Sequence, residues 1–149
     1  MALAAAVFVA DQATKAVVQR NIPVHATVPI LPHFLNFIHT HNAGAAFGLF
    51  SDSPAPWKTM LLIVVSSVLL AMVIAVVWRN PQLRWGTGVG LALILGGALS
   101  NLFDRIRLGQ VVDFLDVYYR SYHWPTFNLA DSAIVLGAGF VVFQLLFLE

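Results

Sequence analysis

The sequence predicts an all-α membrane bundle of four transmembrane helices, with a small β-rich or amphipathic loop region outside the bilayer. Hydrophobic residues make up 59% of the 149 residues and charged residues only 10%, whereas a soluble domain carries about 25% charged residues. Four stretches are long and apolar enough to cross a bilayer. Two further segments are too long to be simple turns, and no internal repeat is visible, so one domain over residues 1–149 is predicted.

The second and third predicted spans are the clearest. Residues 57–78 contain a single charge, Lys58, and are bounded by Trp57 and Trp78, which would lie about 31 Å apart along a helix. This separation matches one aromatic anchor at each membrane interface. Residues 85–103 contain no charge and are rich in glycine, which is typical of close packing between membrane helices.

The first and last predicted spans carry charges. The last covers residues 130–148 and begins with Asp131, and the first covers residues 2–18 and contains Asp11 and Lys15. A cleavable signal peptide would begin with basic residues and have an uncharged core. Because the first segment has neither property, we expect it to remain as a membrane helix.

Two long connections, residues 20–56 and 104–129, are expected on the same side of the membrane because two spans separate them. Prolines disfavour helix in the first connection, and residues 111–117 of the second are strand-like. The short connection, residues 79–84, lies on the opposite side. The total number of Lys and Arg residues would place the long connections in the cytoplasm. The density of arginine would instead place the short connection there.

Composition and spacing exclude several classes of function. The net charge of +1 argues against a nucleic-acid partner, and the lack of cysteine excludes disulfides, thiolate metal sites and a cysteine nucleophile. Ser66, Ser67 and Ser100 lie in apolar helix without a neighbouring base. The histidines lack the H-E-x-x-H spacing of a zinc peptidase, so no metal site is predicted.

Asp11 and Lys15 are charges at membrane depth. Ten residues of helix precede Asp11, about 15 Å or half a bilayer. Lys15 lies four residues later and therefore shares a helix face with Asp11, where the two can pair. The pair is either a structural bridge that orients the first helix or part of a catalytic site, and the sequence leaves both interpretations open.

A second polar group stands at the end of the third span. Asn101, Asp104 and Arg105 are spaced three and four residues apart, so they point to one side of a helix. The alternative is a helix end that emerges into water, with Asp104 and Arg105 as a solvated pair. That alternative is strong for Asp104 and weaker for Asn101, which lies within the apolar segment.

Asp113 and Asp131 both lie on the side of the long connections and within apolar sequence. By itself Asp131 is interpreted as a helix N-cap, a common use of aspartate. Two carboxyl groups brought close together share one proton, because they cannot both ionise freely. This is the acid–base equipment of aspartic proteolysis, so together the two residues predict a catalytic dyad.

A non-enzymatic membrane protein, such as a small transporter or an assembly factor, is the alternative function. Asp11, Lys15 and Asp131 would then form a proton or ion path across the bilayer, but this interpretation leaves Asp113 without a role. Carboxyl groups that face each other at one membrane surface favour the peptidase. Carboxyl groups at different depths favour transport.

Five motifs in order give the chain a family resemblance. They are DQATK at residues 11–15, NAGAAFG at 42–48, GGALSNLFDR at 96–105, VVDF at 111–114 and FNLADSAI at 127–134. Each motif is weak alone, but five in order within a chain of this length are specific. The chain resembles the lipoprotein signal peptidases, also called signal peptidase II.

The resemblance implies a multi-pass aspartic peptidase of the bacterial inner membrane, with its termini in the cytoplasm and its active site towards the periplasm. The implied substrate is a prolipoprotein whose +1 cysteine carries a diacylglyceryl group. The implied enzyme is a monomer in contact with membrane lipids, needs no cofactor and is sensitive to a globomycin-type inhibitor. Its catalytic dyad falls on Asp113 and Asp131, and Asp11 and Lys15 match the first-helix motif. Matching positions that line or support the site are Asn42, Gly44, Asn101, Arg105, Asn128 and Ala130. Ser100 departs from the pattern, since the family usually has glycine there.

Overall fold

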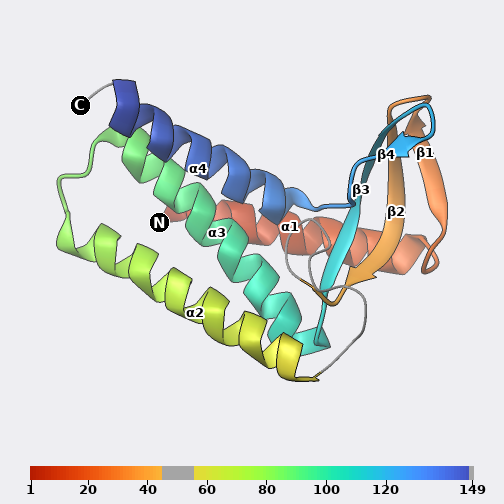
Figure 1. Ribbon diagram of the computed structural model, residues 1–149, viewed down its shortest axis with the longest axis horizontal. Helices are drawn as coiled ribbons and strands as arrows, with labels where there is room; N and C mark the ends of the chain where they lie inside the picture. The colour runs from red at the N-terminus through yellow and green to blue at the C-terminus, as the bar shows by residue number, and fades with distance from the viewer. Residues whose placement is uncertain (45–55, 148–149) are drawn as a thin grey trace.

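The computed structural model describes residues 1–44 and 56–147. Four long helices run lengthwise through the molecule, and the strands gather at one end of them (Figure 1). The start of α1, the end of α4 and the α2–α3 connection lie towards the other end. In chain order the elements are α1 (Ala2–Asn21), β1 (Thr27–Leu31), β2 (Leu35–Asn42), α2 (Pro56–Arg79), α3 (Trp85–Leu108), β3 (Val111–Tyr119), β4 (Tyr122–His123) and α4 (Leu129–Phe147).

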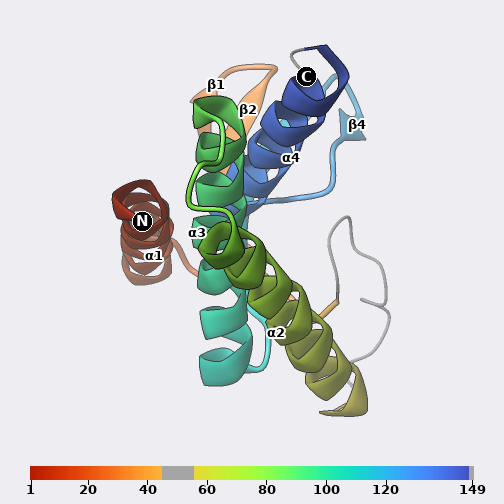
Figure 2. The ribbon, with the colours of Figure 1, turned by 90° about the vertical axis from the view of Figure 1, so that its left-hand side faces the viewer.

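α3 is the central helix of the bundle. It packs against α1, α2 and α4, and Figure 2 shows it with α1 on one side and α2 and α4 on the other. Over the described residues α2, α3 and α4 are each long and apolar enough to cross a membrane. α1 carries Asp11 and Lys15 and is not among them, so length and composition support three of the four expected spans.

Glycine permits close contact between α3 and its neighbours. A methyl group added to Gly137 of α4 would lie 2.5 Å from the carbonyl oxygen of Gly90, and one added to Gly97 would collide with the carbonyl oxygen of Ala130. Gly96 packs in the same way against the backbone of α1. These contacts agree with the role expected for the glycines of the third span, and they hold the start of α4 tightly against α3.

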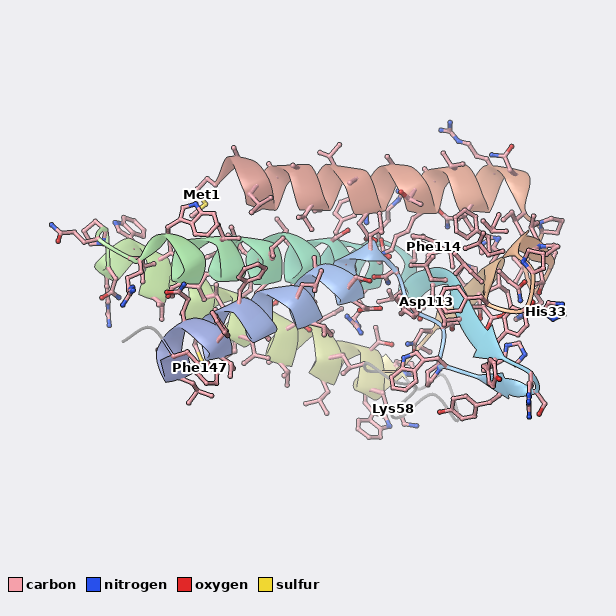
Figure 3. All side chains as sticks on the ribbon, turned by 90° about the horizontal axis from the view of Figure 1, so that it is seen from above. Met1, His33, Lys58, Asp113, Phe114 and Phe147 are labelled. Atoms are coloured by element: carbon pink, nitrogen blue, oxygen red, sulfur yellow. The ribbon has the colours of Figure 1, made fainter. Side chains whose placement is uncertain are left out.

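The sheet joins the two long connections. Its strand order is β1-β2-β3-β4 with every neighbouring pair antiparallel, and its central pair places Thr40 of β2 opposite Asp113 of β3. Val18 and Ile22 at the end of α1 form a buried cluster with Phe114. Figure 3 shows Asp113 and Phe114 where the helices meet the sheet. This apolar cluster therefore anchors β3 to the bundle right beside Asp113.

The third helix is longer than its apolar run. Its span is predicted to end at residue 103, but α3 continues to Leu108. The residues that extend it include Asp104, which is buried because side chains of α1 surround it. Hydropathy alone ends a span at the first charge, whereas a charge with buried partners lets the helix continue.

Candidate active site

Asp113 and Asp131 line one cavity, at the junction of the bundle and the sheet. Asp113 comes from β3 and is 1% exposed, and Asp131 lies in the first turn of α4. The cavity has a volume of about 550 Å³. Its other polar lining residues include Asn42, Asn101 and Arg105. The structure therefore brings together the two carboxyl groups that the sequence predicts to act as a pair.

Asn128 and Asp131 form a reciprocal cap at the start of α4. Asn128 Oδ1 accepts a hydrogen bond of 2.9 Å from the amide of Asp131, and Asp131 Oδ2 accepts one of 3.3 Å from the amide of Asn128. This is a capping box with aspartate in the third helical position. The interpretation of Asp131 as the N-cap is therefore wrong: Asn128 is the N-cap, and Asp131 completes the box from the first turn of α4. The box fixes the backbone from which the carboxyl group of Asp131 enters the cavity.

Three asparagines hold the two carboxyl groups. Asn128 Nδ2 donates to Asp113 Oδ1 at 2.8 Å, and Asn42 Nδ2 donates to Asp113 Oδ2 at 3.2 Å. Asn101 Nδ2 donates to Asp131 Oδ1 at 2.7 Å. Amide donors orient a carboxyl group without adding a charge that would compete for its proton. Both aspartates are thus fixed by neutral partners.

Burial makes the carboxyl group of Asp113 a weaker acid than usual. Desolvation by burial, followed by the charge of Asp131, raises the pKa of Asp113 from 3.8 to about 7, against the opposing effects of Asn42, Lys15 and Asn128. A carboxyl group whose pKa lies near neutrality can give up or take a proton at physiological pH. Asp113 is therefore suited to acid–base chemistry.

Arg105 ties the start of the NAGAAFG motif to the cavity. Its Nη2 donates to the carbonyl oxygen of Gly44 at 3.1 Å, and the amide of Gly44 donates to Asn42 Oδ1 at 2.8 Å. Because Asn42 also contacts Asp113, the first residues of the motif are coupled to the proposed dyad. Residues 45–48 of the motif lie outside the described residues.

Asp11 and Lys15 form an ion pair of 2.6 Å, as expected, and Asp104 is its third member. Lys15 Nζ lies 2.7 Å from Asp104 Oδ2, and both side chains are almost fully buried. The alternative in which Asp104 and Arg105 form a solvated pair at a helix end is therefore wrong. Asp104 is not solvated because α1 covers this face of α3 and supplies the ammonium group of Lys15 as its partner.

Asn128 and Ala130 are fully buried and do not line the cavity; both support it from behind. The motifs and charges of the sequence do not indicate the apolar wall of the cavity. Part of this wall could have been predicted, because residues three and four after Asp131 share its helix face. The lining residues that were not predicted are Val111, Trp124, Pro125, Thr126, Phe127, Ser132, Ile134, Val135 and Leu136.

Sequence comparison relates the chain to known proteins. The profile of signal peptidase II matches residues 3–147. A lipoprotein signal peptidase of Solibacter usitatus is 44% identical over 144 residues, which cover 97% of this chain and 88% of that protein. One from Desulforapulum autotrophicum is 42% identical over 137 residues, which cover 92% and 85%.

Solved structures agree with the sequence relatives. A bacterial membrane enzyme determined at 2.3 Å resolution matches with a TM-score of 0.87 and 30% identity, covering 97% of this chain and 85% of that one. A second bacterial membrane enzyme, determined at 1.9 Å resolution, matches with a TM-score of 0.85 and 30% identity, covering 99% and 92%. The profile match, the relatives and the shared fold confirm the resemblance drawn from the motifs: the chain belongs to the signal peptidase II family.

Proposed function

We propose that this protein is an aspartic endopeptidase that removes the signal peptide from diacylglyceryl-modified prolipoproteins at the outer face of the bacterial inner membrane. Family membership makes it a peptidase of a bacterial membrane that processes prolipoproteins. The observation that carries the aspartic mechanism is the meeting of Asp113 and Asp131 in one cavity. No cofactor enters the proposal, because two carboxyl groups and water suffice.

In the proposed reaction the dyad holds one proton. The ionised carboxylate takes a proton from water, and the water oxygen bonds to the carbon of the scissile amide. The protonated carboxyl group gives its proton to the oxyanion that develops at the carbonyl. Collapse of the tetrahedral intermediate then breaks the C–N bond, and the leaving amine takes the proton that the first carboxylate removed from water. One hydroxyl group of the intermediate returns its proton to the second carboxylate as the carbonyl re-forms, so the dyad again holds one proton. The pKa of Asp113, raised to about 7, suits this exchange at neutral pH.

The supporting residues have distinct proposed roles. Asn42, Asn101 and Asn128 orient the carboxyl groups through the amide hydrogen bonds that they donate. Arg105 holds the carbonyl oxygen of Gly44, and with it the start of the NAGAAFG motif. Ala130 is fully buried and its carbonyl oxygen lies against Gly97, so a larger side chain at this position would push the first turn of α4 out of place.

The apolar wall of the cavity suits a lipid-modified substrate. It is formed in part by Ile134, Val135 and Leu136 of α4, and Val135 and Leu136 are each 60% exposed. Each methylene group that leaves water contributes about 0.8 kcal/mol to the free energy of binding. Acyl chains that lie along α4 would therefore contribute more to substrate binding than a few peptide hydrogen bonds. A lipid-anchored cysteine would also place the scissile bond at the membrane surface, where a soluble peptidase has no access.

The proposed arrangement is a monomeric single domain that crosses the membrane four times. α1 has 20 residues, about 30 Å of helix. Its two central charges are supported as membrane residues by their burial, since Asp11 and Lys15 are 0% and 2% exposed. Arg79 and Arg84 on the short connection suit the cytoplasmic side, which leaves the sheet and the cavity on the periplasmic side.

The test is cleavage of a diacylglyceryl-modified prolipoprotein by purified protein. Asp113→Asn and Asp131→Asn should each abolish cleavage while the protein stays folded, because a dyad acts as a unit. The matched control is Asp116→Asn, a buried carboxylate on the same strand, which should retain activity. A globomycin-type inhibitor should block the wild-type reaction. Normal turnover by either dyad variant would remove that residue from the chemistry, and failure of the wild type to cleave would favour transport.

A further inference from the structure

We propose that Asp11, Lys15 and Asp104 act as one unit, here called the buried triad, that positions the catalytic dyad and sets its protonation from behind. This inference rests on the proposed function and extends it. The buried triad does not line the cavity, so its members would act through other residues. Hydrogen bonds to backbone amides and to Asn101 link the buried triad to the dyad. Electrostatic interaction is a second link.

The buried triad is fully hydrogen-bonded. Lys15 Nζ lies 2.6 Å from Asp11 Oδ2, 2.7 Å from Asp104 Oδ2 and 3.0 Å from Asn101 Oδ1, which uses all three protons of the ammonium group. Ser100 Oγ also donates to Asp11 at 2.7 Å, and Gln12 Nε2 donates to Asp104 Oδ1 at 2.7 Å. The three charged side chains are 0–3% exposed, so the unit is a buried, hydrogen-bonded junction between α1 and α3.

Each carboxylate of the buried triad holds the backbone immediately before one dyad residue. Asp11 Oδ1 accepts a hydrogen bond of 3.0 Å from the amide of Ala130, which precedes Asp131. Asp104 Oδ2 accepts one of 3.3 Å from the amide of Val112, which precedes Asp113. The two dyad residues lie on different elements, β3 and α4, and the same lysine bridges the carboxylates that anchor the backbone before each of them.

A side-chain path leads from Lys15 to both dyad residues. Lys15 is a donor only, so it fixes Asn101 with Oδ1 towards the ammonium group and Nδ2 towards Asp131. The same Asn101 Oδ1 accepts from Asn128 Nδ2 at 3.2 Å, and Asn128 Nδ2 also donates to Asp113. Without the lysine, Asn101 Oδ1 would keep only the longer hydrogen bond from Asn128 Nδ2, so the orientation in which Asn101 donates to Asp131 would be held less firmly.

Charge adds a second means of action. The ionised buried triad has two carboxylates and one ammonium group. The charged groups that act on Asp113 are Asp131 from α4, Arg105 from α3 and Lys15 from α1. Asp11 acts on Asp131, and Asp104 acts on Arg105 and on His41 of β2. Removing the cation should make the dyad harder to ionise, and removing an anion should make it easier. If the buried triad only supported the fold, removing its cation and removing an anion would not shift the pH profile in opposite directions.

The experiment compares the pH dependence of kcat for the wild type, Lys15→Met, Asp104→Asn and Asp116→Asn on lipidated prolipoprotein. We expect kcat to fall at least tenfold in the first two variants. The alkaline limb of the profile should move to higher pH in Lys15→Met and to lower pH in Asp104→Asn. Asp116→Asn, which alters a buried carboxylate outside the site, should leave kcat and the limb unchanged. Thermal midpoints in detergent show which variants are folded.

The possible outcomes separate the two proposals. If the wild type cleaves, Asp113→Asn does not, and the folded Lys15→Met and Asp104→Asn variants keep the wild-type kcat and limb, the role of the buried triad is refuted and the dyad stands. If the alkaline limb moves in the same direction in Lys15→Met and in Asp104→Asn, the charge of the buried triad does not set the protonation of the dyad. If Lys15→Met does not fold, Asp104→Asn and Asp11→Asn decide the question, because both must move the limb to lower pH. Wild-type activity in Asp113→Asn would instead refute the proposed function.

Discussion

Asn101 of α3 donates a hydrogen bond of 2.7 Å to Asp131 of α4. The bond crosses the α3–α4 interface one helical turn from the point where Gly97 meets the backbone of Ala130. The orientation of a proposed catalytic carboxyl group thus depends on how closely two membrane helices approach each other.

Gly97→Ala should therefore damage both stability and activity. The added methyl group would collide with the carbonyl oxygen of Ala130, and overpacking of this kind costs about 1–3 kcal/mol. The variant should show a lower thermal midpoint in detergent and a reduced kcat. The matched control is Gly88→Ala on the same helix, where an added methyl group meets nothing within 4 Å. Equal midpoints for the two variants would show that the close contact does not limit stability.

The raised pKa of Asp113 predicts a pH-dependent stability. In the folded protein this pKa is about 7, against 3.8 in the unfolded chain, so the folded state holds a proton that the unfolded state releases. For this group, the free energy of unfolding is highest below about pH 4, falls as the pH rises to about 7 and is constant above it.

Asp113→Asn removes this titration, which gives the measurement. The thermal midpoint of the variant relative to the wild type should rise between pH 4 and pH 7 and then level off. The comparison uses one detergent and buffers of matched ionic strength. A difference that stays constant across this range would contradict the assigned pKa.

Arg105→Gln should lower the rate of cleavage without unfolding the protein. It removes the charged donor to the carbonyl oxygen of Gly44, and a hydrogen bond to a charged group is worth about 1.5–3 kcal/mol. We expect a loss of kcat/KM on the order of tenfold to a hundredfold. Arg107→Gln, an exposed arginine on the same helix, is the control and should retain activity. Equal rates in the two variants would mean that the Gly44 contact has no part in the reaction.

The lipid on the substrate should be required for efficient cleavage. An unlipidated precursor lacks the acyl chains that would follow α4, so its kcat/KM should be far below that of the diacylglyceryl form. Equal rates on both substrates would refute lipid anchoring even if the dyad were correct.

A matched pair of valines tests where the acyl chains lie. Val135→Thr places a hydroxyl group in the cavity wall, whereas Val142→Thr makes the same change on α4 outside it; these valines are 60% and 53% exposed. Val135→Thr should raise KM severalfold for the lipidated substrate only, because polar surface disfavours an acyl chain. If Val142→Thr has the larger effect, the chains follow another path.

Much of the protein could be predicted because its signals are local. The apolar runs that became α2, α3 and α4 report directly on a bilayer, since every residue in hydrocarbon meets the same solvent. Asp11 and Lys15 were paired correctly because a helix places residues four apart on one face. Asp113 and Asp131 were singled out because carboxyl groups within apolar sequence are costly unless they are used.

Other features required the tertiary structure, because they join segments that no local period relates. The sequence leaves a solvated helix end open for Asp104, and only the packing of α1 on α3 shows that Asp104 shares Lys15 with Asp11. Likewise, nothing in either connection says that β2 pairs with β3, the pairing that sets Thr40 opposite Asp113. By itself the sequence determined which charged residues lie in apolar segments, where burying an unpaired charge is unfavourable. The long-range contacts decided which partners offset that cost, since a buried charge or amide is stabilised only by the group that reaches it in space.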